Sequence, residues 1–199
     1  MTPKQAERLK NKITKIKRAL ADDKKRWGGF YDDSRGLRYL QPELYIKLDD
    51  YTGALSYFNW FQKNFPDDSC FAMFLFEWTL TLQKTKRIKQ AETKALETFF
   101  SNTYLFDKFL QKEPIHHFKN QNSNWEQSSL DEYFHYSRDE KRFSEFTEWL
   151  EQFLSGEKFY RFANRFIEIQ KQLETEPIGP KRNSLIEEQY SLPDKFENE

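Results

Sequence analysis

Two helix-spaced apolar segments meet at a polar turn within residues 39–66, and this arrangement constrains the fold more than any other feature of the chain. The apolar positions are Leu40, Leu44, Tyr45 and Leu48 in the first segment and Ala54, Leu55, Phe58 and Phe61 in the second. Steps of three and four residues are typical of amphipathic helices, and Pro66 ends the second segment. With a turn at 49–53, the stretch predicts a helical hairpin. One hairpin cannot bury all of its apolar surface, so we expect others to stack on it.

The same spacing recurs along the rest of the chain. We expect further helices at about residues 4–26, 70–83, 86–100, 104–110, 129–136, 143–156 and 159–173. The helix at 70–83 is apolar on nearly every face and is therefore predicted to be the most buried. The helices at 70–83 and 86–100 should form a second hairpin, and the last two helices a third. Because no segment alternates as a strand does, the predicted fold is all-α, with antiparallel helix hairpins stacked as a short, irregular α-α superhelix.

Length and composition favour one folded domain. The chain has 199 residues, of which 37% are hydrophobic and 18% aromatic, so its core must consist largely of rings. We predict a single helical domain over residues 1–176, beginning with a basic amphipathic helix at 1–26. Residues 177–199 are predicted to form a polar, partly flexible tail. Its apolar residues Leu185, Ile186, Tyr190 and Leu192 are suited to docking as a short segment.

The charges of the chain balance as a whole and differ locally. There are 32 basic and 32 acidic residues, so no global field steers the protein to nucleic acid or to an anionic membrane. Residues 1–26 nevertheless contain ten basic and three acidic side chains. The single cysteine, Cys70, excludes an intramolecular disulfide and favours a reducing compartment, so we expect a cytoplasmic protein. Lysines interrupt every apolar run near the N-terminus, which argues against a membrane-spanning segment there.

The central hairpin resembles a tetratricopeptide repeat. The residues that follow the steps of that family's second helix are Tyr51, Ala54, Phe58, Phe61 and Pro66. Phe61 stands where the family has alanine, while Arg38 and Gln41 replace the expected tryptophan and leucine of the first helix. Residues 102–114 also resemble a segment of tetratricopeptide-like proteins. The resemblance implies stacked helix hairpins and a concave groove, lined by first helices, that binds peptides.

These features favour a non-catalytic module that binds a protein or a peptide. The candidate groove residues are Arg38, Tyr39, Tyr45, Trp60, Asn102 and Tyr104. Each also has an ordinary structural interpretation. The rings of Tyr39, Tyr45 and Trp60 can be part of the core, Arg38 can be a surface charge, and Asn102 can cap a helix. An exposed aromatic face on a terminal hairpin is also compatible with a homo-oligomer. The alternative function is nucleic-acid association through Lys10, Lys12, Lys15, Lys17, Arg18, Lys24, Lys25 and Arg26.

The sequence does not predict an enzyme. Phosphate-loop, Rossmann, nucleophile-elbow and zinc-protease patterns are absent. The polar segment 111–127 contains His116 and His117, but adjacent histidines do not readily face one metal ion, and Glu113 is the nearest carboxylate. We therefore expect neither a metal nor a cofactor. An enzymatic function resting on these histidines or His135 would require one of them to meet a carboxylate in a deep pocket.

Overall fold

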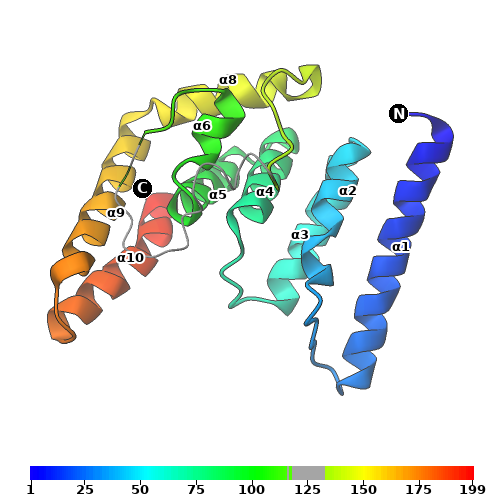
Figure 1. The fold of residues 1–199 in the computed structure, drawn as a ribbon, viewed down its shortest axis with the longest axis horizontal. Coiled ribbons are helices and arrows are strands. Elements are labelled where there is room, and N and C mark those ends of the chain that lie inside the picture. The colour runs from blue at the N-terminus through cyan, green and yellow to red at the C-terminus, as the bar shows by residue number, and fades with distance from the viewer. Residues whose placement is uncertain (116, 118–132) are drawn as a thin grey trace. The chain divides into compact units, whose positions relative to one another are not determined.

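The computed structural model describes residues 1–115, 117 and 133–199 (Figure 1). Its helices are α1 (Pro3–Arg26), α2 (Gln41–Lys47), α3 (Tyr51–Asn64), α4 (Ala72–Lys84), α5 (Ile88–Ser101), α6 (Leu105–Leu110), α8 (Ser144–Leu154), α9 (Glu157–Thr175) and α10 (Pro180–Asn198), with 3-10 turns η1 (Leu37–Tyr39) and η2 (Lys141–Phe143). The chain divides into two compact units, unit 1 (residues 1–70) and unit 2 (residues 71–199). The single domain predicted for residues 1–176 stays a prediction.

Unit 1 consists of α1, η1, α2 and α3. Helix α1 begins with a capping box in which the Thr2 hydroxyl accepts from the Gln5 N–H and the Gln5 side chain accepts from the Thr2 N–H. Its apolar stripe buries Ile13, Ile16 and Leu20, as the spacing predicts. Because α1 packs on α2, and α2 packs on α3, the short helix α2 is covered on two sides.

The central hairpin forms from α2 and α3. Asp50 caps α3, because its Oδ1 accepts from the Gly53 N–H at 2.8 Å. A Cβ atom on Gly53 would overlap the Asp50 carboxylate and lie 2.6 Å from Cε1 of Tyr45, so only glycine fits where the two helices approach. The turn is shorter than predicted, because α3 already begins at Tyr51.

The inner face of α2 differs in part from the predicted one. Leu44 and Tyr45 are buried as expected, but Leu40 is 44% exposed. Leu40 lies at the junction with the 3-10 turn η1, where the residue-to-residue rotation differs from that of an α-helix. Ile46, which the spacing did not assign to the inner face, is fully buried because α2 lies between two helices.

The α4–α5 hairpin is the centre of unit 2. Helix α4 buries all but two of its 13 residues, which confirms the prediction for the apolar segment at 70–83. Phe74 is fully buried in unit 2, as Phe58 is in unit 1. On α5, Ala91 and Ala95 are fully buried, and their small side chains allow α4 to approach closely.

A group of rings around Phe76 joins α4 to later parts of unit 2. We define the Phe76 cluster as Phe76, Phe106, Phe109, Phe134, Tyr136 and Phe146, whose centroids lie 5.0–6.3 Å from that of Phe76. Tyr136 also donates a hydrogen bond to the buried carboxylate of Glu77, with an O–O distance of 2.5 Å.

A helix was predicted at 129–136. Its first four residues lie outside the described part of the chain. Phe134 and Tyr136 are not helical, and both are buried while His135 between them is exposed, as in an extended segment.

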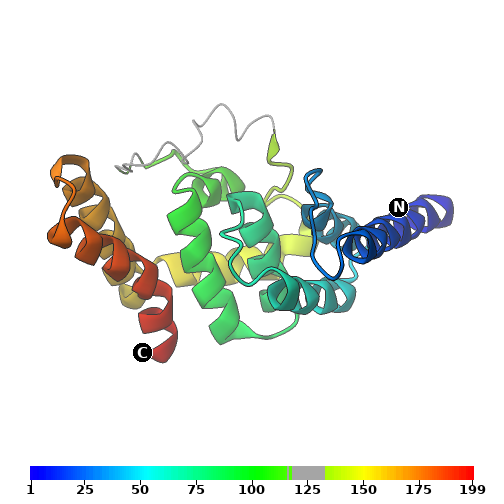
Figure 2. The same ribbon diagram turned by 90° about the horizontal axis from the view of Figure 1, so that it is seen from below.

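Helices α9 and α10 lie side by side (Figure 1, Figure 2). The sequence predicted a hairpin of α8 with α9, and a polar, partly flexible tail at 177–199. Instead, residues 180–198 form α10, whose buried Leu185, Leu192 and Phe196 repeat at helical spacing. Arg165 on α9 forms a two-pronged ion pair with Glu188 on α10, at 2.7 and 2.6 Å. These contacts explain why α10 is a packed helix.

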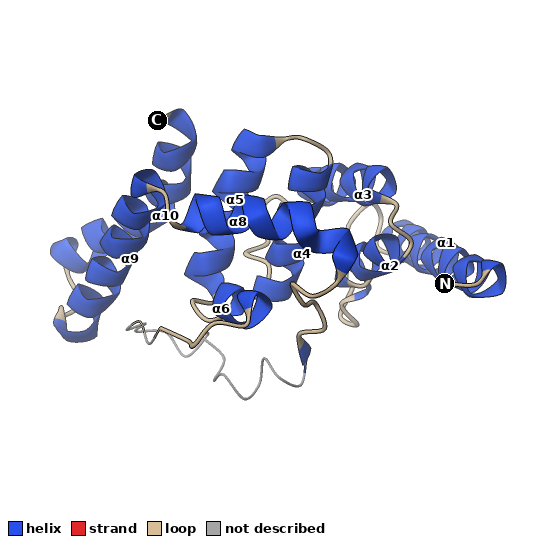
Figure 3. Cartoon of the chain, turned by 90° about the horizontal axis from the view of Figure 1, so that it is seen from above, coloured by secondary structure: helices blue, strands red, loops and turns tan. Residues whose placement is uncertain are grey.

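Helices, turns and loops account for all the described residues, and no strand occurs among them (Figure 3). The all-α class predicted from the sequence is confirmed. Within residues 1–115, 117 and 133–199, no helix combines the length and apolar character needed to cross a bilayer.

Candidate ligand-binding site

A cavity of about 320 Å³ lies within unit 1, among α1, the first turn of α2, and α3. We call it the Gln41 pocket; it is lined by Lys17, Leu20, Ala21, Tyr31, Gln41, Ser56, Tyr57 and Trp60. Apolar and aromatic walls with a few polar groups are typical of ligand pockets, and the volume falls at the lower end of their usual range.

The aromatic wall of the Gln41 pocket is fixed by contacts among its own rings. The Trp60 ring lies 5.3 Å from Tyr57 and 5.8 Å from Tyr31, the latter edge to face. The Tyr57 hydroxyl donates to the backbone carbonyl of Arg38, and burial raises the pKa of Tyr57, so this phenol stays protonated. The Lys24 ammonium lies 5.0 Å from the Tyr31 centroid. The wall is therefore organised without a ligand.

The carboxamide of Gln41 distinguishes this cavity from an ordinary gap between helices. Gln41 is fully buried, and neither its Oε1 nor its Nε2 has a hydrogen-bond partner within the described part of the chain. A buried polar group without a partner costs about 1–3 kcal/mol. A carboxamide offers one acceptor and two donors side by side. A carbonyl and an N–H presented together would satisfy it. Because its polar atoms have almost no accessible surface, this pairing requires the side chain to turn towards the cavity.

A polar network holds the chain just before Gln41. The Asp33 carboxylate accepts from the N–H groups of Leu37 and Arg38, both at 2.8 Å, which fixes turn η1. The Arg38 guanidinium lies 3.2 Å from Asp33 and 2.9 Å from Asp68. The Tyr39 hydroxyl donates to Asp68 at 2.7 Å. We call these four side chains, Asp33, Arg38, Tyr39 and Asp68, the Arg38 network.

The contacts within the Arg38 network favour the ionised forms of Asp68 and Arg38. Burial and the bond to Asp68 raise the pKa of Tyr39 to about 12. Burial alone would raise the pKa of Asp68, but the bonds from Tyr39, the Cys70 N–H and Arg38 outweigh it and lower that pKa. For Arg38, burial is likewise outweighed by the bond to Asp68, and its pKa rises. At neutral pH, Asp68 is an anion that orders Arg38 and Tyr39.

The structure distributes the six predicted groove residues between the units. Trp60 lines the Gln41 pocket, Arg38 and Tyr39 belong to the Arg38 network, and Tyr45 is buried with the Lys17 ammonium 5.5 Å from its centroid. The other two, Asn102 and Tyr104, belong to unit 2 and are not part of this lining.

Asn102 caps a helix, as its structural interpretation predicts. It is the C-cap residue of α5, and its Oδ1 accepts from the Tyr104 N–H at 2.9 Å. Ligand contact by any of the six residues stays a prediction. The sequence missed Gln41 as a site residue, although its departure from the repeat pattern was a visible signal.

Unit 2 brings a histidine and a carboxylate into one cavity. Asp107 and His117 both line a space of about 210 Å³ that also contacts Phe99 and Phe159. Asp107 Oδ2 accepts from the Ile115 N–H at 3.1 Å. Burial raises the pKa of Asp107 and lowers that of His117, and each charge partly offsets the burial effect on the other. His117 and Asp107 therefore share one cavity, but no hydrogen bond or ion pair joins these two described side chains, and the lining defines no reaction.

The other predicted features of this region are not described. His116 and residues 118–127 of the polar segment lie outside the described residues. Among the described residues, no three His, Cys, Asp or Glu side chains converge as metal ligands.

Asp107→Asn is expected to stabilise the protein at about pH 7 and to have little effect at about pH 3. The raised pKa means that the folded state favours the protonated carboxyl, so this contribution is present below the unfolded pKa of about 3.9 and is lost as pH rises through the folded value. Asparagine keeps an acceptor for Ile115 without the charge. Thermal unfolding of both proteins at the two pH values measures the effect. A variant less stable than wild type at neutral pH would contradict the prediction.

Comparisons with protein-family models, with curated proteins and with solved structures find no match to this chain.

Proposed function

We propose that this protein is a non-catalytic module that binds a peptide segment of a partner protein in the Gln41 pocket. The observation that carries the proposal is the fully buried Gln41 carboxamide, whose polar atoms have no partner within the described part of the chain. An extended peptide presents carbonyl and N–H groups that such a carboxamide can bind, and the rings of Tyr57 and Trp60 offer apolar contact to a neighbouring side chain.

Preorganisation supports the same proposal. The Arg38 network fixes the turn that leads into Gln41, and ring contacts fix the wall, so a ligand does not have to order these two parts of the site. The α2–α3 hairpin and its resemblance to a tetratricopeptide repeat are further support, because that family commonly binds peptides. The exposed side chain of Lys17 at the pocket suits an acidic residue in the peptide.

Gln41→Met tests the proposal because it should change stability and binding in opposite directions. Methionine has nearly the same shape and removes the unpaired polar atoms, so we expect a gain in stability of about 1 kcal/mol or more. Peptides selected from a random display library on the wild-type protein should bind this variant about tenfold more weakly, because their amide loses its partner. Calorimetric titration with the selected peptides measures the affinity.

A matched control is available in unit 2. Gln83 is also buried with an unpaired Oε1 among the described residues, but it does not line the Gln41 pocket. Gln83→Met should leave peptide affinity unchanged. If selection yields no peptide that prefers wild type to Gln41→Met, the proposed function is wrong.

Nucleic-acid association through α1 remains the alternative. Lys10, Lys12 and Lys15 are exposed, which favours phosphate contacts, whereas Lys24 donates to Asn64 at 3.0 Å. Such binding would weaken steeply with salt, because phosphate contacts release counterions.

For the proposed module we favour the cytoplasm, a reducing compartment suited to a chain with one cysteine.

A further inference from the structure

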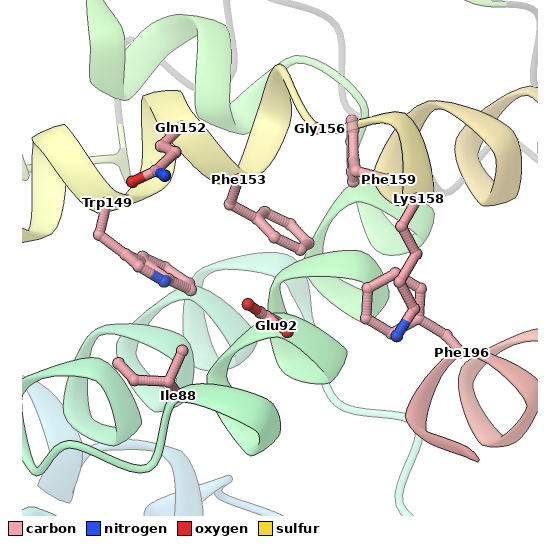
Figure 4. Close-up of a pocket in the computed structure, with 9 residues that line it drawn as sticks. All are labelled: Ile88, Glu92, Trp149, Gln152, Phe153, Gly156, Lys158, Phe159 and Phe196. Carbon is pink, nitrogen blue, oxygen red and sulfur yellow. The ribbon is translucent and has the colours of Figure 1, made fainter. Parts of the chain in front are cut away.

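A second cavity, of about 390 Å³, lies within unit 2 and combines aromatic rings with one carboxylate (Figure 4). We call it the Glu92 pocket; its lining includes Ile88 and Glu92 from α5, Trp149 and Phe153 from α8, Lys158 from α9 and Phe196 from α10. In Figure 4, the rings of Trp149 and Phe153 extend from α8 towards α5, and the Glu92 carboxylate points into the space beside them.

The charges in this pocket are separated. Glu92 makes no ion pair with any other described residue. The Lys158 ammonium lies 4.0 Å from the centroid of Phe196, and in Figure 4 its side chain runs alongside that ring. Trp149 and Phe153 stack with centroids 5.6 Å apart and an interplanar angle of 11°. The pocket therefore presents a carboxylate without an ion-pair partner among the described residues, two stacked rings, and a lysine that lies over Phe196.

We propose that the Glu92 pocket binds an arginine side chain of a partner polypeptide. Aromatic faces attract cations, and a planar guanidinium stacks on rings while donating hydrogen bonds to a carboxylate. A quaternary ammonium ion has no N–H to donate to Glu92, and a lysine ammonium is a more strongly hydrated point charge. Ile88 offers apolar surface to the methylene groups of the arginine stem. The inference concerns unit 2 alone and does not depend on the Gln41 pocket.

Two peptides that differ only in charge test this inference. N-acetyl-Gly-Arg-Gly-amide is titrated into the full chain, and the indole N–H signal of Trp149, assigned with Trp149→Phe, is followed by NMR. Saturable shifts are expected. The same peptide with citrulline, a neutral analogue of arginine, should bind at least about tenfold more weakly, because it lacks the charge that Glu92 and the rings recognise.

Protein variants locate the effect. Glu92→Gln should weaken arginine-peptide binding about tenfold. Glu97→Gln is the matched control, because Glu97 lies on the same helix and is paired with Lys94 at 2.5 Å. Glu97→Gln and Gln41→Met should both leave binding unchanged, and the second of these separates this site from the one in unit 1.

Three outcomes would overturn the inference. Equal binding of the citrulline peptide would show an apolar cavity without charge recognition, and equal binding of a lysine peptide would exclude guanidinium selectivity. Binding by Lys158→Gln but not by wild type would show that Lys158 itself occupies the place of the ligand beside Glu92.

Discussion

Phe76→Ala is expected to destabilise unit 2 by about 3–5 kcal/mol, the usual cost of truncating a buried phenylalanine in a core. Phe76 is fully buried, and its ring contacts those of Phe109, Phe134 and Tyr136 at 5.0–5.3 Å. These partners belong to two separate segments, α6 and residues 134–136, so they cannot all move into the cavity together. Urea unfolding followed by helical circular dichroism measures the loss.

Tyr190→Ala is the control for this prediction. Tyr190 is also an aromatic residue in a helix of unit 2, but it is 73% exposed, so its truncation should change stability by less than about 0.5 kcal/mol. Phe76→Leu should fall between the two, because leucine fills part of the cavity. A cost for Phe76→Ala similar to that of Tyr190→Ala would mean that the Phe76 cluster does not form the core of unit 2.

Apolar periodicity predicted most of the helices and the one that is most deeply buried, but not α10 or the extended residues 134–136. In α4, residues such as Phe74, Phe76 and Leu80 cover more than one face, so the segment has no side suited to water. That inference needs no knowledge of neighbours. The buried face of α1 could also be predicted without knowing its neighbours, because Ile13, Ile16 and Leu20 define a single face by themselves.

The neighbours of each helix were harder to predict, because periodicity shows that a face is apolar and not what covers it. The stripe of α9, including Phe162 and Phe166, was assigned to α8, whereas α10 is its main partner. The sequence partly concealed α10. Pro193 lies inside it, and the exposed Tyr190 interrupts the pattern of Leu185 and Leu192. Favourable packing of a helix can outweigh a missing backbone donor.

The two pockets show that the sequence also does not reveal which polar residues lack partners in the fold. Trp60 was recognised as a candidate because tryptophan is enriched at binding sites. Gln41 and Glu92 were not, because polar residues are common and only the folded structure shows that the carboxamide and the carboxylate lack partners among the described residues. The one sequence signal was Gln41 itself, a polar residue at a position where the resemblance to a tetratricopeptide repeat predicts leucine.

Asp68→Ala is expected to destabilise unit 1 by about 2–3 kcal/mol at neutral pH. The Asp68 side chain is 12% exposed and binds Arg38, the Tyr39 hydroxyl and the Cys70 N–H. Its removal takes one of two carboxylate partners from the partly buried Arg38 cation and an anionic acceptor from the Tyr39 hydroxyl, and such losses cost more than one ordinary hydrogen bond. Amide hydrogen exchange in α2 and α3, followed by mass spectrometry, should speed up accordingly.

The pH dependence of this variant provides a second measurement. Because the pKa of Asp68 is lowered in the folded state, its contribution is present above the unfolded pKa of about 3.9 and is lost as pH falls through the folded value. The difference between Asp68→Ala and wild type should therefore shrink in acid. Asp67→Ala is the matched control, because the neighbouring Asp67 is exposed and should contribute less than about 0.5 kcal/mol. Equal effects of the two substitutions at neutral pH would show that the Arg38 network does not stabilise the segment leading into Gln41.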